Sequence, residues 1–413
     1  MTAGRTIVIG AGPAGLTAAI TLAKGGRPTT LVMKGLGGLQ LGQGTIDVLG
    51  YVGDERVDFP FDHLDRLPEQ HPYRLIGEEA VLEGVAAFTD ALGEGVLVGE
   101  AGVNGLYPTA VGALRPTTLV PASMAAGRAE EGKEYLIVGV DELKDYHAEL
   151  IAGNLVRCGR AARHARISLP ARDGEVDCNP VQYARAMDRP DFRRRFAAAI
   201  KPLVQPGEVV GVPAILGLND PAVHAEVEAA IGAPVFEIVS QPPSIPGMRL
   251  NQALLAQAKQ LGVRVILGAE VTGMQTADGR VTAVTIHTAG RSRDLAASEV
   301  VHCPGGFESG ALAVDSYNTV SETILGLPVT ATDATELIHG DYWGRPQPLF
   351  EVGVRVDERM RVLGEDGSVL HPNLYAAGGI LAGSVRWQEK SGEGIALGSA
   401  AKAARSILEG DQA

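Results

Sequence analysis

Residues 9–35, IGAGPAGLTAAITLAKGGRPTTLVMKG, decide the fold that this sequence predicts. Gly10, Gly12 and Gly15 form the pattern G-x-G-x-x-G between an apolar strand at 6–9 and a stretch whose apolar residues recur with a helical period. A turn of this kind presents backbone N–H groups and a helix N-terminus to a phosphate, and its third glycine lets helix and strand pack closely. The stretch therefore predicts a βαβ unit that binds a nucleotide.

The second strand of this unit, 30–33, lacks the acidic residue that usually ends it. That carboxylate normally holds a ribose hydroxyl about 20 residues after the glycines. Here the strand ends in Met33-Lys34, and the first acidic residue of the chain is Asp47. A weaker hold on an adenosine ribose makes an FMN-sized flavin possible, while the nearby basic residues leave NADP open as an alternative. The glycine-rich loop at 35–50 is expected to wrap an anion with its backbone N–H groups.

The composition of the 413 residues limits the remaining possibilities. The length suits about two or three domains, and a net charge of −13 argues against a nucleic-acid surface. Cys158, Cys178 and Cys303 share no C-x-x-C spacing, which argues against a disulfide framework, an iron–sulfur cluster or another metal site in this chain. The uncharged run at 6–23 is better explained as strand, turn and helix than as a membrane helix or signal peptide, so we expect a cytoplasmic protein.

Three later segments resemble, in order, those of flavoproteins with two dinucleotide-binding folds. In the first, the strand-rich stretch 263–306, Val271 would lie beside an adenine and the turn at 304–306 near the pyrophosphate. The second, NLYAAGG, resembles the strand that ends at the ribityl chain, although its last residue, Gly379, stands where many flavoproteins have an acid. The third, SGEGIALG at 391–398, would aim a helix N-terminus at the flavin ring.

These features predict an α/β fold, a two-dinucleotide-binding-type (FAD/NAD(P)-binding, Rossmann-like) flavoprotein with an inserted α/β domain. The flavin-binding domain is expected to be discontinuous, comprising residues 1–50, 249–306 and 351–413. Residues 51–248 would form an inserted substrate or partner domain, and residues 307–350 a small cap. The predicted cofactor-binding residues are Gly10, Gly12, Pro13, Ala14, Gly15, Met33, Lys34, Gly38, Gly42, Gly44, Thr45, Val271, Pro304, Gly305, Gly306, Gly378, Gly379, Gly392, Glu393, Gly394 and Ile395.

Nearly the whole chain resembles one family, the flavoprotein B subunit of anaerobic glycerol-3-phosphate dehydrogenase. The resemblance rests on the acid-free N-terminal motif and on short segments that occur in the same order. These are GQGTIDVL (42–49), HPYRLIG (71–77), GALRPTTL (112–119), YLIVGVDELKDY (135–146), VPAILGL (212–218), PPSIPGMRL (242–250) and NLYAAGGILAG (373–383). The segment VRWQEKSGEG departs from the family, because it carries charged residues where a smaller, more apolar glycine run is expected.

The resemblance implies a flavin-containing subunit with FMN as its usual cofactor, whereas the N-terminal motif indicates FAD. The implied complex oxidises sn-glycerol 3-phosphate to dihydroxyacetone phosphate and passes electrons to a membrane quinone in anaerobic respiration. Its implied partners are a sister FAD-containing catalytic subunit and an iron–sulfur membrane-anchor subunit. They would hold this chain at the cytoplasmic face of the membrane.

Two residues are candidates for contact with a substrate. Arg249 follows PPSIPGM at the head of a helix and would either clamp a phosphate or carboxylate or form a salt bridge between domains. His71 would be a general base or a hydrogen-bonded loop histidine. His302, within an apolar strand, is expected to be a core residue. Arg386, near the last glycines, would stabilise an anionic reduced flavin or be solvated.

Two other functions are consistent with the sequence. A stand-alone FAD-dependent oxidoreductase of the fumarate-reductase kind would have its flavin reduced by substrate without any partner. A non-catalytic flavin-fold scaffold with a decayed site would explain the missing acids, and the purified protein would then be colourless.

Overall fold

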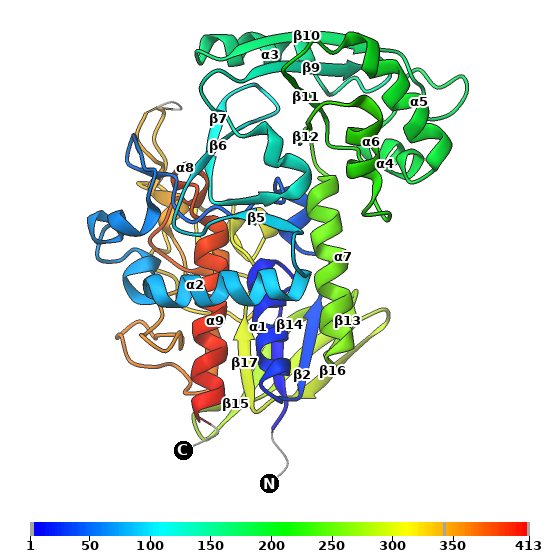
Figure 1. Cartoon of the computed structure of the whole chain (residues 1–413). Helices are drawn as coiled ribbons and strands as arrows, with labels where there is room; N and C mark the ends of the chain where they lie inside the picture. Colours follow the sequence, from blue (N-terminus) through cyan, green and yellow to red (C-terminus); the bar gives the residue numbers. More distant parts are fainter. Residues whose placement is uncertain (1–3, 342–343, 411–413) are drawn as a thin grey trace. The chain divides into compact units, whose positions relative to one another are not determined.

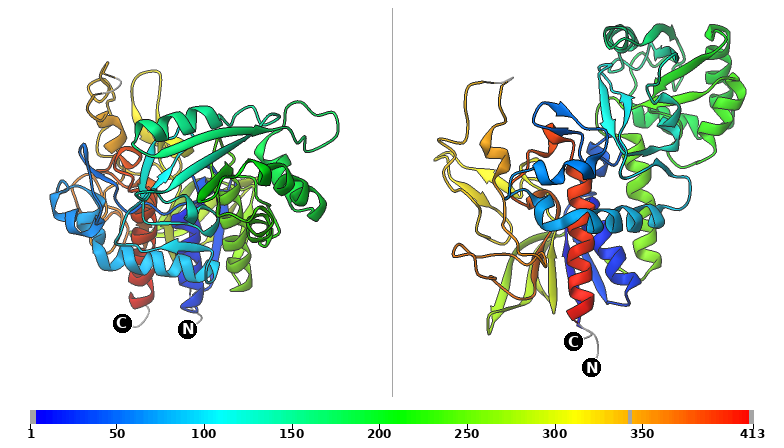
Figure 2. Two further views of the ribbon diagram at one scale, coloured as in Figure 1. Left: turned by 45° about the horizontal axis from the view of Figure 1, so that its top comes forward. Right: turned by 60° about the vertical axis from the view of Figure 1, so that its left-hand side comes forward.

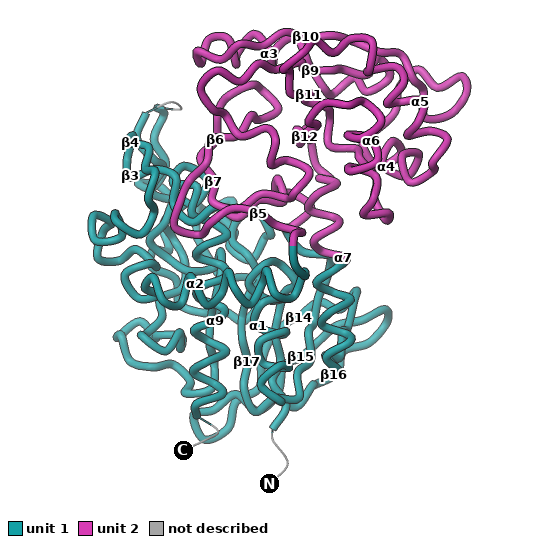
Figure 3. The backbone as a smooth tube through the Cα atoms, viewed as in Figure 1, with its two compact units in different colours: residues 1–38, 47–94, 253–413 teal, residues 39–46, 95–252 magenta. Residues whose placement is uncertain are grey.

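The computed structural model describes residues 4–341 and 344–410, and the chain forms two compact units (Figure 3). Unit 1 comprises residues 1–38, 47–94 and 253–413, and unit 2 comprises residues 39–46 and 95–252. Each unit is built on a parallel sheet of its own.

Unit 1 contains a five-stranded parallel sheet in the order β13-β2-β1-β17-β20. Its strands are β1 (Thr6–Ile9), β2 (Thr29–Met33), β13 (Arg264–Leu267), β17 (Glu299–His302) and β20 (Leu374–Ala376). The predicted βαβ unit is confirmed, because β1, α1 (Pro13–Lys24) and β2 follow one another as expected. Since β2 and β17 pair with opposite edges of β1, the strand order reverses at β1. Doubly wound sheets bind their ligands at the carboxyl ends of the strands beside such a point.

Two further helices pack with α1 in unit 1. α9 (Gly392–Gly410) lies beside α1, and α2 (Pro72–Leu92) crosses both (Figure 1). The backbones of α2 and α9 touch at Gly84, where a Cβ atom would lie 2.2 Å from the Leu397 carbonyl oxygen. Glycine at position 84 is therefore required by the close approach of the two helices.

The boundary between the units differs from the one expected from the sequence. Residues 51–94 were expected in the inserted domain, yet they belong to unit 1. The physical reason is the packing of α2 on α9, to which the Tyr73 hydroxyl adds a hydrogen bond to the Val48 carbonyl oxygen. Residues 307–350, expected as a small cap, also belong to unit 1, whereas residues 95–252 form unit 2 together with residues 39–46.

The rest of unit 1 consists of short elements and one antiparallel sheet. That sheet has the order β14-β15-β16, and its first turn places Asp278 and Gly279 at φ 51° and 74°, as a two-residue type I′ hairpin requires. The strands outside the main sheet are β3 (Tyr51–Val52), β4 (Glu55–Arg56), β14 (Glu270–Ala277), β15 (Arg280–Thr288), β16 (Arg291–Ala296), β18 (Leu312–Val314) and β19 (Val320–Glu322). The short helices are η2 (Pro60–Arg66), η5 (Phe307–Ser309), η6 (Pro348–Glu351), η7 (Gly378–Ile380) and α8 (Arg386–Glu389).

Unit 2 has a four-stranded parallel sheet in the order β10-β9-β11-β12, with helices packed against it (Figure 2). Its core is formed by the buried apolar residues of β9, β11 and β12 and of the helices around them. The strands of unit 2 are β5 (Leu97–Gly99), β6 (Gly105–Pro108), β7 (Leu114–Thr117), β8 (Leu119–Pro121), β9 (Glu134–Val140), β10 (Ala161–Ile167), β11 (Glu208–Pro213) and β12 (Val235–Ile238). The helices are η3 (Ala122–Gly127), α3 (Ala148–Arg157), α4 (Pro180–Met187), α5 (Pro190–Ile200), η4 (Lys201–Leu203) and α6 (Val223–Ile231). Two elements cross a boundary between the units, namely η1 (Gly38–Leu41) and α7 (Ile245–Gln260).

Candidate cofactor site

The glycine turn after β1 is shaped by close backbone packing and by an open helix end. Gly10 has φ 96°, and a Cβ atom there would lie 2.2 Å from the Cys303 carbonyl oxygen. A Cβ atom at Gly15 would lie 1.9 Å from the Gly10 carbonyl oxygen, so helix and strand touch as predicted. Gly12 is the N-cap of α1, and a Cβ atom there would come no nearer than 3.9 Å to Gly38 N. Space is therefore left beside the N-terminus of α1, where an anion is favoured.

Two later glycine turns lie at the same edge of the sheet. One follows β17 at 304–306, where Gly305 has φ 91°, and the other follows β20. A Cβ atom at Gly378 would lie 2.9 Å from the Cβ atom of Ala14, in the first turn of α1. The structure thus brings Pro13 and Ala14 together with the residues after β17 and β20. These three turns form a cradle of backbone groups around the start of α1, which fits the phosphates of a nucleotide.

The end of β2 carries an ion pair in place of the expected acid. Met33 is buried, and the Lys34 Nζ atom lies 2.7 Å from Oε1 of Glu270, the first residue of β14. The hydrogen bond from Lys34 lowers the pKa of the Glu270 carboxyl. Val271, expected beside an adenine, is buried and pairs with Ile286 in the antiparallel sheet. A carboxylate therefore does lie near the end of β2. Sequence reasoning missed it because it comes from a strand more than two hundred positions later.

The start of α9, expected at the flavin ring, is fixed by the segment that follows residue 46. Gly394 N donates a hydrogen bond of 2.9 Å to the Asp47 carbonyl oxygen. A Cβ atom at Gly394 would lie 2.1 Å from the Tyr73 hydroxyl, so that only glycine fits there. Gly392 and Glu393 form the first turn of the helix, and Ile395 is fully buried. The position of this helix N-terminus is therefore set by packing inside unit 1.

His71 lies at the N-cap of α2 and is buried. Its Nδ1 atom accepts a hydrogen bond from Tyr73 N, and its Nε2 atom lies 3.1 Å from Oε2 of Glu389. The Ser391 hydroxyl donates to the same carboxylate at 2.7 Å. Burial alone would raise the pKa of Glu389, but His71 and Ser391 hold it below its ordinary value. The residue expected as a general base or a hydrogen-bonded histidine thus joins the start of α2 to the segment before α9.

Arg249 belongs to unit 2 and has an internal partner there. Its Nη1 and Nη2 atoms donate to Glu237 at 2.7 and 3.0 Å, and its Nε atom donates to the Gly217 carbonyl oxygen at 2.7 Å. Glu237 is 1% exposed and also accepts from the Ser123 hydroxyl. Of the two interpretations of Arg249 that the sequence leaves open, the geometry corresponds to the salt bridge, although both partners lie in the same unit.

The remaining predicted residues are distributed as follows. Gly38 closes the first segment of unit 1, whereas Gly42, Gly44 and Thr45 belong to the short segment of unit 2. Gly44 has φ 78°, and a Cβ atom there would lie 2.9 Å from the Pro246 side chain. His302 is fully buried with Nε2 3.1 Å from Glu322, which confirms it as a core residue.

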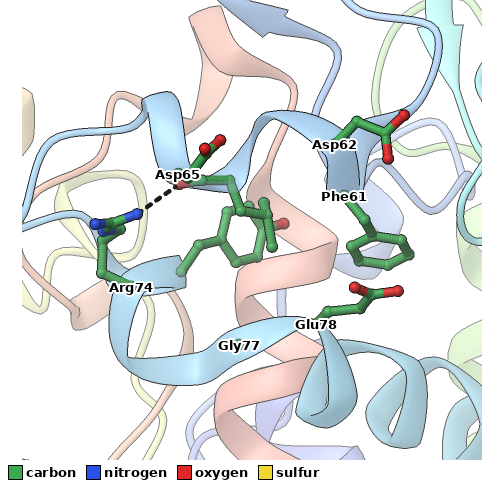
Figure 4. Close-up of a pocket in the computed structure, with 8 residues that line it drawn as sticks. Phe61, Asp62, Asp65, Arg74, Gly77 and Glu78 are labelled. Carbon is green, nitrogen blue, oxygen red and sulfur yellow. Dashed lines mark hydrogen bonds between the residues drawn. The ribbon is translucent and has the colours of Figure 1, made fainter.

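A pocket of about 430 Å³ opens elsewhere in unit 1, between η2 and the start of α2 (Figure 4). Asp62, Asp65 and Glu78 line it together with Arg74, whose Nη1 donates to the Leu64 carbonyl oxygen at 3.5 Å. Three carboxylates against one guanidinium disfavour a phosphate there. None of its lining residues is among the predicted cofactor-binding residues.

Two features are absent from residues 4–341 and 344–410. In that part of the chain no histidine, cysteine, aspartate and glutamate side chains gather in a way that could hold a metal ion. No helix there has both the length and the apolar character that crossing a membrane requires.

The chain is similar to one protein family over most of its length and to several known proteins. Residues 5–395 match the FAD binding domain family. The probable B subunit of anaerobic glycerol-3-phosphate dehydrogenase from Halobacterium salinarum is 32% identical, over 98% of this chain and 97% of that protein. The B subunit of anaerobic glycerol-3-phosphate dehydrogenase from Pectobacterium atrosepticum is also 32% identical, over 98% of both chains. A flavocytochrome c3 fumarate reductase in its open conformation has a TM-score of 0.47 at 11% identity, covering 98% of this chain and 78% of that one.

The expected fold and cofactor class are thereby confirmed. The family match covers most of the chain and supports a flavin, FAD in particular, rather than the plain NADP-binding domain that the missing acid left open. The identity to the curated relatives extends over nearly the whole length of both chains. This chain therefore belongs to the FAD binding domain family and, within it, to the family of the B subunit of anaerobic glycerol-3-phosphate dehydrogenase.

Proposed function

We propose that this chain is a redox subunit that takes part in the oxidation of sn-glycerol 3-phosphate to dihydroxyacetone phosphate with a quinone as electron acceptor. The reaction removes two electrons and two protons from the secondary alcohol, and the quinone takes up both pairs to become a quinol. A bound flavin would supply the two-electron chemistry. The names of the curated relatives support the substrate, and the family match supports the flavin.

The single observation that carries the proposal is the meeting of three glycine turns around the start of α1. In unit 1 the residues at 10–15, at 304–306 and at 378–379 lie at one edge of a parallel sheet. Backbone N–H groups and the dipole of α1 would hold the phosphates there. The start of α9 would face the flavin ring, where its positive end favours the negative charge that develops on reduction.

We assign His71 and Arg249 positioning roles rather than contact with reacting atoms. Both ring nitrogens of His71 and all three guanidinium nitrogens of Arg249 already have a hydrogen-bond partner within the chain. His71 would hold the loop before α9 in place through Glu389. Arg249 would stabilise unit 2 through Glu237, and unit 2 would serve as the substrate or partner domain.

The chain would work in a complex, as the names of its relatives suggest. We propose a sister FAD-containing subunit that contacts the substrate and an iron–sulfur subunit that passes electrons to the quinone. This arrangement would keep the present chain at the cytoplasmic face of the membrane. A stand-alone oxidoreductase and a scaffold without cofactor are the competing functions.

The test begins with the absorption spectrum of the purified full-length chain and the mass of any flavin released from it. We expect a flavin spectrum and release of FAD. Anaerobic addition of sn-glycerol 3-phosphate should then bleach the flavin in the complex co-expressed with its sister subunits. Bleaching of the isolated chain would favour the stand-alone oxidoreductase. A colourless chain that takes up no flavin on reconstitution would refute the proposal and leave the scaffold.

A further inference from the structure

The guanidinium of Arg386 occupies the space that two glycines leave at the carboxyl edge of the main sheet. A Cβ atom at Gly379 would lie 2.4 Å from Arg386 Nη1, and a Cβ atom at Gly306 would lie 2.8 Å from Nη2. Gly306 ends the turn after β17, and Gly379 follows β20. Any side chain at either position would therefore displace the guanidinium. Where an acidic side chain would extend from position 379, the structure thus has the cationic guanidinium of Arg386.

Glu308 holds Arg386 in this position. Its carboxylate accepts hydrogen bonds of 3.1 Å from Nη1 and of 3.1 and 3.2 Å from Nη2. The Arg386 side chain is 26% exposed and the Glu308 side chain 54% exposed. A guanidinium has five N–H donors, so one carboxylate does not saturate it. The pair therefore fixes the orientation of Arg386 and leaves it able to bind a further anion.

The surroundings favour a phosphate as that anion. Gly378, next to Gly379, packs against Ala14 in the first turn of α1, so Arg386 shares its sheet edge with the N-terminus of that helix. The first turn of α1, all of it described, contains no acidic residue. A helix N-terminus and a guanidinium both favour phosphate oxygens, and a guanidinium can bind two of them at once.

We propose that Arg386 binds a phosphate group of the flavin nucleotide. Its guanidinium lies at the place where, in many flavoproteins, an acidic side chain binds the ribityl chain. The inference rests on the proposed function, because it requires a flavin at this edge. It makes affinity depend on the phosphate, which FMN and FAD carry and riboflavin lacks. Arg386 is then a residue that selects phosphorylated flavins.

The test is a fluorescence titration of the flavin-depleted full-length chain with FAD, FMN and riboflavin. Arg386→Met should weaken binding of FAD and FMN roughly 10- to 100-fold, the range for a hydrogen bond to a charged group, and leave riboflavin unchanged. Arg386→Lys should weaken binding of FAD and FMN less than Arg386→Met does, because lysine keeps the positive charge but lacks the paired N–H donors of a guanidinium. The matched control is Arg405→Met, which removes another arginine of unit 1 with two carboxylate partners, Glu79 and Glu83, and should change nothing.

A second variant tests the same role without removing the arginine. Glu308→Gln withdraws the competing carboxylate and should strengthen binding of FAD and FMN while riboflavin stays the same. If all three flavins weaken equally in Arg386→Met, or none does, the inference is wrong while the proposed function stands. If flavin binding is unchanged but the KM for glycerol 3-phosphate rises, the phosphate belongs to the substrate and the inference is also wrong. A wild-type chain that binds none of the three flavins refutes both.

Discussion

Replacing Arg249 by methionine removes the cation that compensates a fully buried carboxylate. The Glu237 side chain is 0% exposed, and burial by itself would raise its pKa. The Arg249 guanidinium, with the Ser123 hydroxyl and the Leu216 N–H, more than offsets that penalty and holds the pKa of Glu237 below its ordinary value. Without Arg249 the carboxylate would be left buried and uncompensated. Removing one partner of such a pair costs about 3–5 kcal/mol.

Hydrogen exchange followed by mass spectrometry measures this loss within unit 2 alone. A two-unit chain has no single unfolding free energy, so a local measurement is preferable to a global one. Amides of β12, which carries Glu237, and of its neighbour β11 should lose about two to four powers of ten in protection in Arg249→Met. Arg166→Met is the matched control. Its pair with Asp141 has a contact of 2.6 Å, close to the 2.7 Å between Arg249 and Glu237, but is 47% and 46% exposed, so its loss should stay below about 1 kcal/mol.

The pH dependence distinguishes this explanation from a loss of packing. Because the folded pKa of Glu237 is depressed, the stabilisation by the pair is complete above the unfolded value of about 4.3 and is lost as the pH falls through the folded value. In Arg249→Met burial dominates and the pKa of Glu237 is raised, so protonation relieves the cost. The difference from wild type should therefore shrink between about pH 7 and about pH 5. Glu237→Gln in the Arg249→Met background should also recover part of the lost protection, because it removes the uncompensated buried charge. A cost equal to that of Arg166→Met, or one that grows at acid pH, would refute the reasoning.

Two further predictions concern a pair of glycines and the free thiols. Gly84→Ala should lower the hydrogen-exchange protection of the α2 and α9 amides, at a cost of about 1–3 kcal/mol, because its Cβ atom would meet the Leu397 carbonyl oxygen at 2.2 Å. Gly153→Ala, also in a helix but with nothing within 4 Å, should instead stabilise by about 0.5–1 kcal/mol, and the same sign for both would contradict the packing argument. Cys158 should be the single thiol that reacts quickly with a maleimide, because the other two cysteines are buried. Burial, with a hydrogen bond to Glu175, raises the pKa of Cys178 to about 11, and burial raises the pKa of Cys303 as well. Fast labelling of more than one thiol would contradict the prediction that only Cys158 reacts quickly.

Local patterns were sufficient to predict the first βαβ unit and the glycine turns. A strand, a G-x-G-x-x-G turn and a helix are specified by residues that lie close together in the chain, and β1, α1 and β2 appear where the sequence puts them. The hairpin at Asp278-Gly279 is local for the same reason, because both residues must adopt positive φ. Elements of this kind depend little on the rest of the fold.

The place of α2 and the partners of the charged residues depend on tertiary contacts. α2 was expected in the inserted domain because nothing in its own pattern says which helix it meets. Gly84 inside that helix is the one local signal, since a helical glycine costs about 1 kcal/mol and suggests close packing. Arg249 and Glu237 are 12 positions apart, but their pairing depends on how α7 follows β12. The sequence therefore left a clamp and a salt bridge equally open.

The two missing acids have a common structural explanation. At the end of β2 the cation Lys34 lies against Glu270, and after β20 the cation Arg386 fills the space at Gly379 and lies against Glu308. In both places a hydrogen-bond donor stands where the motif usually has an acceptor, and a carboxylate from another segment partly balances its charge. A ribose hydroxyl can donate a hydrogen bond to an acceptor or accept one from a donor. A phosphate only accepts hydrogen bonds, so a cationic donor binds it better than a carboxylate does. After β20 the donor is Arg386, and its contact with a phosphate of the flavin nucleotide would belong to a working site rather than to a scaffold.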